Sequence, residues 1–116
     1  MRLESQIRDG VGILRLAGRF VTGSDAAFLS AKNGLERAGI VNAVVDLSEV
    51  PYVDSTGLAF VVELHKALQR RGGQLVLANA NARVREVLEM TRISEIVPMF
   101  DDVEDAEDSL RGEVLC

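Results

Sequence analysis

The chain has 116 residues, of which 47% are hydrophobic and 27% charged, so it can bury one core and is too short for two ordinary domains. No apolar run approaches the roughly 20 residues that cross a bilayer, and the first residues lack the basic-then-apolar order of a signal peptide, so we expect a cytoplasmic protein. The single cysteine, Cys116, excludes an internal disulfide, and with the single histidine, His65, it excludes zinc sites of Cys and His.

The net charge of −5 is distributed unevenly. Residues 101–116 hold seven acidic residues and one arginine, a net charge of −6, whereas residues 1–100 hold 12 basic and 11 acidic residues, a net charge of +1. A nearly neutral body offers no basic face to a phosphate backbone. We therefore expect no nucleic-acid partner. Because no apolar run is long enough to cross a bilayer, we also expect no direct contact with a membrane.

The first half of the chain predicts a hairpin, a helix and a buried strand. Apolar residues between positions 3 and 16 are interrupted by Asp9-Gly10, which supplies the positive φ angles of a tight turn. A helix capped near Ser24 follows and ends at Gly39, with an apolar side formed by Phe28, Leu29, Leu35 and Ala38. The Val-rich run Val41–Leu47 predicts a buried central strand.

The second half continues the alternation after a loop at residues 48–53. A long helix runs from Asp54 or Ser55 to Arg71 and is stopped by Gly72-Gly73; its apolar side is Leu58, Val61, Val62, Leu64 and Leu68. We then predict a strand at Gln74–Ala78, a helix capped by Asn81, an edge strand at Ile96–Met99, and an acid-rich helix at Asp101–Leu110 with a solvated face. The fold class is α/β with a mixed sheet.

Motifs for common enzyme chemistry are missing from the sequence. There is no phosphate-binding glycine loop. A catalytic triad on Ser55 is implausible because His65 lies ten residues on in the same helix, about 15 Å along its axis. His65 is expected to be partly buried and hydrogen-bonded to the backbone. The acidic cluster lacks the glycine and the alternating ligands of a calcium loop. We expect no catalytic residues, cofactor or metal.

The junction between the Val-rich strand and the long helix has two interpretations. In a structural one, Asp54 caps the helix, Ser55 and Thr56 fill its first turn, and Gly57 lets the helix pack closely on the sheet. In a functional one, a hydroxyl at a helix start is a phosphoacceptor, because free N–H groups and the helix dipole stabilise the phosphate. The residues alone leave both interpretations open.

The same junction resembles a known family. The run V-V-D-L-S-E-V-P-Y-V-D-S-T-G-L, then R-R-G-G-Q-L-V-L-A and a helix ending V-L-E-M-T, is similar to the STAS domain, specifically to the stand-alone anti-anti-sigma factors of bacteria, also called anti-sigma factor antagonists. The resemblance implies one STAS domain over residues 1–116, with a mixed sheet of four or five strands flanked by about four helices and an acidic helix and tail at 101–116.

The resemblance also implies a function in the regulation of transcription by partner switching. Ser55 would be phosphorylated by an anti-sigma factor that is also a serine kinase, and a PP2C-type phosphatase would remove the phosphate; Thr56 is the alternative acceptor. The unphosphorylated protein, a monomer or weak dimer, would bind the kinase and free a sigma factor. The contact surface would comprise Asp54, Ser55, Thr56, Gly57, Ala59 and Glu63, together with the loop Val21, Thr22, Gly23 and Ser24.

Two features depart from the family pattern. The chain has Val21 where the family often has an acid, and Arg92 where the family often has a glycine, so we expect Arg92 to carry a modest left-handed strain. Two alternatives to the switch stay open. The domain could be a constitutive interaction module in a transporter or larger complex, or a receiver phosphorylated on Asp46, although the acidic pair and the lysine of a receiver are missing from their places.

Overall fold

The computed structural model describes residues 2–18 and 25–111. The elements, in chain order, are β1 (Arg2–Arg8), β2 (Val11–Ala17), α1 (Asp25–Arg37), β3 (Asn42–Glu49), α2 (Ser55–Arg70), β4 (Gln74–Ala78), α3 (Ala82–Met90), a short 3₁₀ turn (Ile93–Glu95), β5 (Met99–Phe100) and α4 (Val103–Arg111). The predicted order of strands and helices is confirmed. Ser24, the predicted cap of the first helix, lies outside the described residues.

The strands form one five-stranded mixed sheet in the order β1-β2-β3-β4-β5. β1 and β2 pair antiparallel through a two-residue turn, in which Asp9 and Gly10 have φ angles of 52° and 80°. β2, β3, β4 and β5 run parallel to one another. The Asp9-Gly10 hairpin and the mixed sheet are therefore as the sequence predicted.

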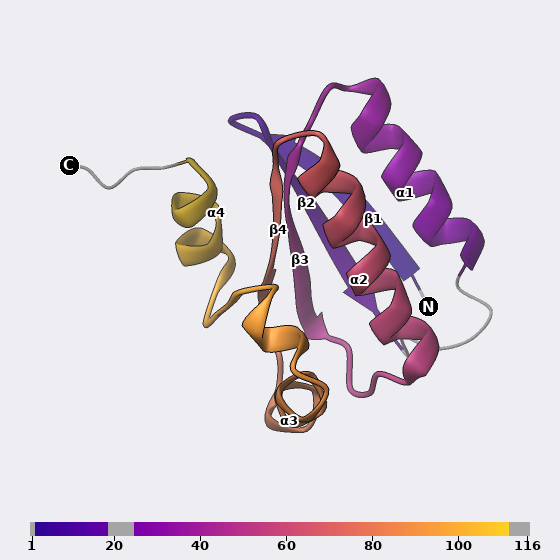
Figure 1. Cartoon of the computed structure of the whole chain (residues 1–116), viewed down its shortest axis with the longest axis vertical. Helices are drawn as coiled ribbons and strands as arrows, with labels where there is room; N and C mark the ends of the chain where they lie inside the picture. Colours follow the sequence, from indigo (N-terminus) through magenta and orange to yellow (C-terminus); the bar gives the residue numbers. More distant parts are fainter. Residues whose placement is uncertain (1, 19–24, 112–116) are drawn as a thin grey trace.

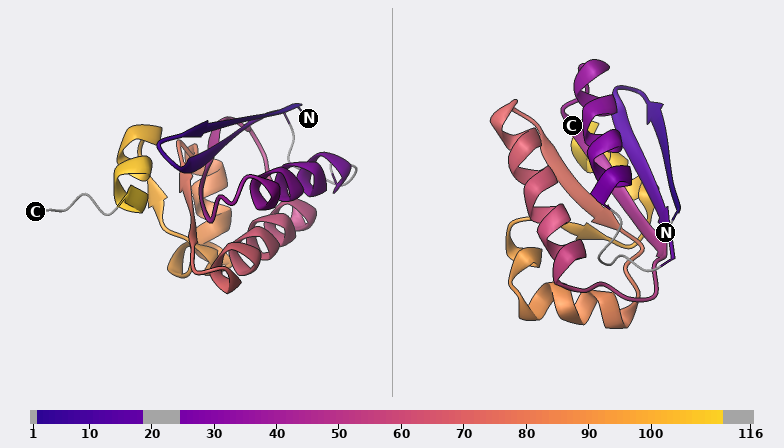
Figure 2. Two further views of the ribbon diagram at one scale, coloured as in Figure 1. Left: turned by 90° about the horizontal axis from the view of Figure 1, so that it is seen from above. Right: turned by 90° about the vertical axis from the view of Figure 1, so that its right-hand side faces the viewer.

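Helices cover both faces of the sheet. Figure 1 shows α1 and α2 side by side on one face, α4 on the other, and α3 across the end where the parallel strands finish; the view from above in Figure 2 separates these layers. The main core lies between the sheet and α1 and α2, and includes Leu14, Val45, Leu64 and Leu77. A smaller core, with Val11, Val44, Val76, Ala78 and Ala106, lies beneath α4.

The predicted edge strand and one residue of the first helix's predicted apolar side differ from the structure. The edge strand predicted at Ile96–Met99 is shifted to Met99–Phe100, because Ile93–Glu95 curls into a 3₁₀ turn and Pro98 contributes only its carbonyl, which accepts the N–H of Leu77 at 2.9 Å. In α1, Leu29 is 57% exposed rather than buried.

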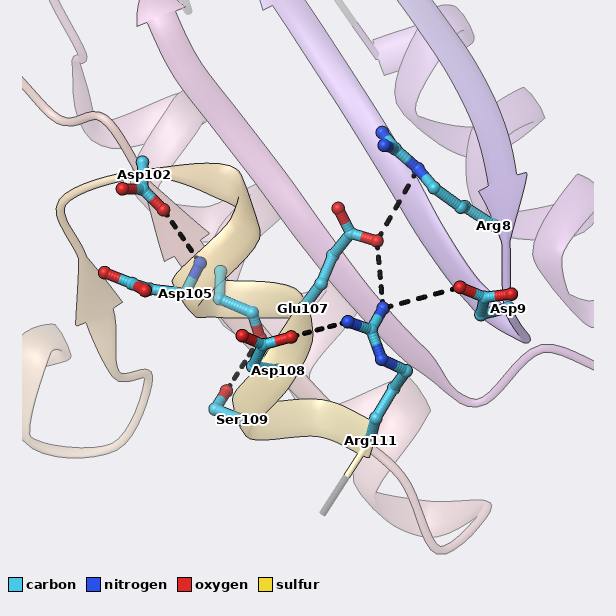
Figure 3. Close-up of polar contacts among 9 residues, drawn as sticks. Arg8, Asp9, Asp102, Asp105, Glu107, Asp108, Ser109 and Arg111 are labelled. Carbon is cyan, nitrogen blue, oxygen red and sulfur yellow. Dashed lines mark hydrogen bonds and ion pairs between the residues drawn. The ribbon is translucent and has the colours of Figure 1, made fainter. Parts of the chain in front are cut away.

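The acid-rich helix has the predicted solvated face, on which Asp102, Glu104, Asp105 and Asp108 are exposed. Its other side is buried, which the sequence did not predict. Ala106 is fully buried and Glu107 is only 3% exposed, since α4 packs across the sheet. Figure 3 shows Glu107 directed at Arg8 of the β1–β2 hairpin and at Arg111, at 3.6 and 3.2 Å. Arg111 also pairs with Asp108 and Asp9. The helix is therefore held to the hairpin by charge as well as by apolar packing.

Backbone strain occurs where the sequence suggested it. Arg92 has a φ of 64°, in the left-handed region, directly after α3. A side chain there is less favourable than glycine because its Cβ crowds the carbonyl.

Candidate functional site

The start of α2 lies at the carboxyl end of the parallel strands, beside α3 (Figure 1). Asp54 has an extended backbone, and its Oδ1 accepts the N–H groups of Thr56 and Gly57 at 2.9 and 3.1 Å. Gly57 is buried. The predicted cap and the predicted close packing at the helix start are confirmed.

This cap changes one premise of the functional interpretation. That interpretation relied on free N–H groups at the helix start, but the N–H groups of Thr56 and Gly57 already donate to the carboxylate of Asp54. A phosphate on Ser55 would therefore stand next to a carboxylate instead of receiving these two donors. The helix dipole remains as a favourable contribution.

The two hydroxyls at the helix start differ in position. Ser55 is exposed, whereas Thr56 is half-buried. Successive residues of a helix point about 100° apart. As a result Ser55 and Thr56 line different grooves, one on each side of α2.

The groove that Ser55 lines, groove A, separates α2 from the end of α3 and the 3₁₀ turn. Its volume is about 470 Å³ and its lining is mainly apolar: Ser55, Leu58, Ala59, Val62, Glu63, Lys66, Thr91 and Ile93. Leu58 and Val62 were predicted to belong to the apolar side of α2, but they are only partly buried because they face this groove. Helical periodicity predicts that Leu58 and Val62 lie on the apolar side of α2, but it does not predict the groove next to them.

The second groove, groove B, separates α1 from α2. It has a volume of about 310 Å³ and is lined by Phe28, Leu29, Lys32, Thr56, Ala59, Phe60, Glu63, Leu64 and Arg70. The rings of Phe28 and Phe60 stack with centroids 3.7 Å apart. The exposed Leu29 belongs to this groove, which accounts for its departure from the predicted core.

The structure brings most of the predicted contact residues together. Ala59 and Glu63 are exposed and line both grooves, one and two turns after Ser55. Asp54, Ser55, Thr56 and Gly57 precede them at the helix start. The predicted loop residues Val21, Thr22, Gly23 and Ser24 lie outside the described residues.

A buried carboxylate occurs on the α4 side of β3. Asp46 is 3% exposed and accepts hydrogen bonds from Arg15 Nε, the backbone N–H of Ser48 and Asn79 Nδ2, at 3.1, 3.0 and 3.1 Å. Burial raises the pKa of Asp46, but the hydrogen bonds from Asn79, Ser48 and Arg15 outweigh burial and hold this pKa below its ordinary value of 3.8. The carboxylate is thus fully engaged, which does not favour a receiver-type phosphoacceptor.

His65 is half-buried, and its Nδ1 is buried. The backbone hydrogen bond predicted for it is not found: within residues 2–18 and 25–111, Nδ1 has no hydrogen-bond partner.

No helix in this part of the chain is long and apolar enough to span a membrane.

The mixed sheet with helices on both faces defines an α/β domain of the STAS type. The family model described as "STAS domain" matches residues 2–106, and the chain belongs to this family. The anti-sigma-B factor antagonist of Listeria monocytogenes is 34% identical over 99 residues, which cover 80% of this chain and 82% of the relative. The anti-sigma F factor antagonist of Paenibacillus polymyxa is 25% identical over 103 residues, 88% of each chain. These antagonists are not a family of enzymes.

Solved structures show the same fold. The anti-sigma factor antagonist SpoIIAA in its unphosphorylated form superposes with a TM-score of 0.84 at 17% identity, over 98% of this chain and all of that one. The phosphorylated form of SpoIIAA, a Bacillus cell fate determinant, gives 0.73 at 16% identity, over 95% of this chain and all of that one. A high affinity sulfate transporter of Stylosanthes hamata is 36% identical over 58 residues, which are 50% of this chain and 9% of the transporter.

Proposed function

We propose that this protein is an anti-sigma factor antagonist controlled by phosphorylation of Ser55. The unphosphorylated form binds an anti-sigma factor that is also a serine kinase and so releases a sigma factor; phosphorylation ends this binding. A PP2C-type phosphatase restores the active form, and the cycle takes place in the cytoplasm. The observation that carries the proposal is the exposed hydroxyl of Ser55 at the start of α2, in a chain whose relatives are anti-sigma factor antagonists.

The local electrostatics support a switch that acts on the partner and not on the fold. A phosphate adds about −1.5 to −2 charges at neutral pH. Because Asp54 already accepts the N–H groups of Thr56 and Gly57, the phosphate stays at the surface and repels the adjacent carboxylate. A partner that covers the helix start must then remove water from two neighbouring anions, which opposes binding.

The surface offered to the partner extends from the helix start along α2. Ala59 and Glu63 are exposed and separate the two apolar grooves. An apolar side chain of a partner that enters groove A passes Ser55, so a single phosphate there affects the whole contact. SpoIIAA, which shares this fold, exists in unphosphorylated and phosphorylated forms, and this also supports the proposal.

The experiment is phosphate incorporation with the anti-sigma factor kinase from the source cell, identified by affinity capture on the unphosphorylated chain. We expect labelling of the wild type and of Thr56→Ala, and none of Ser55→Ala. Labelling that persists in Ser55→Ala and is lost in Thr56→Ala would move the acceptor to Thr56. Binding of the kinase that is equally tight to wild type and Ser55→Asp would contradict the switch itself.

A second candidate function is a constitutive interaction module in a transporter or larger signalling complex. The similarity of half of this chain to a short part of the Stylosanthes sulfate transporter favours it. In this case capture yields no kinase, and Ser55→Asp leaves every bound partner in place.

A further inference from the structure

Within the described residues, the outer edge of β1 is the long unpaired edge of the sheet. β1 has seven residues without proline or bulge, it pairs with β2 on one side, and all of its residues except Leu3 are exposed. The opposite edge, β5, has two residues, follows Pro98 and leads into α4. Short strands, proline and covering helices protect sheet edges from pairing with another chain, and β1 has none of these in the described structure.

The hairpin fixes which backbone groups of β1 point outward. In a hairpin with a two-residue turn, the residues that flank the turn exchange both hydrogen bonds. Arg8 and Val11 flank Asp9-Gly10, so even-numbered residues of β1 direct their N–H and C=O groups at β2. The groups of Leu3, Ser5 and Ile7 therefore point outward, where another strand can accept and donate.

Apolar surface accompanies this edge. Ile7 is 53% exposed. It borders a groove of about 390 Å³ between β1 and α1, lined by Leu3, Ser5, Ile7, Ala27, Ser30, Ala31, Gly34 and Leu35. A strand added to β1 would cover part of this surface as well as the outward backbone groups.

The charged side chains on the other face of β1 can form further ion pairs. Glu4 lies opposite Arg15 of β2, but Arg15 pairs with Asp46, and among the described residues Glu4 has no ion pair within 4 Å. Arg8 is paired with Glu107 at 3.6 Å, but its side chain is still 46% exposed. Figure 3 shows Arg8 at the end of its strand, with its side chain extended toward Glu107 of α4. A complementary strand would place a positive charge opposite Glu4 and a negative charge opposite Arg8.

We propose that the strand that pairs with β1 is β1 of a second copy, antiparallel and centred on Gln6. In this register Glu4 of each copy lies opposite Arg8 of the other copy. The outward backbone groups of Ser5 in each copy likewise pair with those of Ile7 in the other. Centring on Glu4 would place the two copies of Glu4 opposite each other. Centring on Ser5 would place Arg2 of each copy opposite Arg8 of the other. Centring on Leu3 would also match Arg2 with Glu4, but it pairs only residues 2–4 of the described strand. Of the longer registers, centred on Glu4, Ser5 or Gln6, the one on Gln6 matches opposite charges, which favours cross-strand pairing.

The resulting dimer is weak and depends on concentration. Its contact consists of four backbone hydrogen bonds in the exposed centre of the pairing and two ion pairs that stay near water, where such pairs stabilise little. Dimerisation joins the two sheets into one and leaves the start of α2 outside the paired strands. The proposed dimer is therefore independent of the proposed phosphorylation of Ser55.

The first test is sedimentation equilibrium of the full chain. We expect the weight-average mass to rise with concentration from 12.6 kDa toward twice that value, and Glu4→Lys, which faces Arg8 with a like charge twice, to weaken dimerisation about tenfold. The matched control, Glu95→Lys, makes the same charge change at an exposed position of the 3₁₀ turn and should dimerise like the wild type. Circular dichroism establishes that each variant is folded.

The second test fixes the register by cysteine cross-linking, with Cys116→Ser as background and oxidised glutathione as oxidant. Residues at a non-hydrogen-bonded antiparallel pair have Cα atoms about 4.5 Å apart, so Gln6→Cys should form a disulfide-linked dimer. Glu4→Cys should not, because two copies of residue 4 are then about 13 Å apart along the strands. A chain that stays monomeric at millimolar concentration, or a cross-link that is stronger for Glu4→Cys than for Gln6→Cys, would overturn the proposal.

Discussion

The carboxylate of Asp54 lies 2.9 Å from the backbone nitrogen of Thr56 and 3.1 Å from that of Gly57, and accepts a hydrogen bond from each. One side chain thus satisfies two of the N–H groups that a helix start leaves without partners. The same two bonds orient the first turn of α2, on which Ser55 is displayed.

Replacing this cap should destabilise the domain. We expect Asp54→Ala to lower the free energy of unfolding by about 1 kcal/mol, within the usual range for a lost N-cap, and Asp54→Asn to lower it by much less because its amide oxygen still accepts. Urea unfolding measures both. Equal losses for Ala and Asn would show that the charge of Asp54, and not its hydrogen bonds, stabilises the helix.

The two glycines Gly73 and Gly34 should respond to alanine in opposite ways. A Cβ on Gly73 would overlap the backbone carbonyl of Val41, whereas a Cβ on Gly34, inside α1, meets nothing within 4 Å. We expect Gly73→Ala to lower the free energy of unfolding by about 3 kcal/mol or more. Gly34→Ala should raise it by about 0.5–1 kcal/mol, since alanine is the better helix former. Thermal unfolding of the two variants checks the signs, and a stable Gly73→Ala would mean that the backbone at residue 73, just before β4, does not approach Val41 so closely.

Elements set by local chemistry could be predicted from the sequence. The caps at Asp54 and Asn81 and the turn at Asp9-Gly10 depend on residues within a few positions, and all three are found. The burial of Glu107 could not be predicted, because it depends on Arg8, which is 99 positions away in the chain. The shift of β5 has the same kind of cause: β4, not the local sequence, determines which residues pair with it.

In the candidate site, too, features set by neighbouring residues could be predicted, and features set by distant segments could not. The identity of the helix start and the exposed positions Ala59 and Glu63 follow from capping and helical periodicity. The grooves beside them require the positions of α1 and of the turn after α3, which no spacing within α2 encodes.

The depressed pKa of Asp46 predicts a loss of stability in acid. A carboxylate whose pKa is lower in the folded than in the unfolded chain stabilises the fold above the unfolded value, and this contribution is lost as the pH falls toward the folded value. For Asp46 the window begins near its ordinary value of 3.8 and extends below it. Asp46→Asn should therefore lose less stability than the wild type between about pH 4 and pH 2.

Urea midpoints over this pH range provide the measurement for Asp46. Asp101→Asn is the matched control, because the side chain of Asp101 is 90% exposed and the substitution makes the same change of charge. If wild type and Asp46→Asn lose stability in parallel, the contacts with Arg15, Ser48 and Asn79 do not favour the ionised form.

The buried carboxylate of Glu107 should stabilise the docking of α4. Glu107→Gln keeps the shape of the side chain but removes the charge that faces Arg8 and Arg111 at 3.6 and 3.2 Å. Both arginines retain access to water, since the side chain of Arg8 is 46% exposed and that of Arg111 is 24% exposed. The substitution therefore leaves no buried arginine charge without a partner or water. We therefore expect a loss of about 1–2 kcal/mol, typical of charge-assisted hydrogen bonds, and less than when a fully buried pair is broken.

Urea unfolding of Glu107→Gln beside Glu104→Gln makes this comparison. Glu104 lies one turn earlier in α4 and is exposed, so its substitution changes the net charge equally without touching the sheet. Because the arginines reach water, the loss at Glu107 should shrink as salt is added. A loss at Glu107 no larger than at Glu104 would mean that the apolar contacts of Ala106, Val103 and Leu110 hold α4 without help from charge.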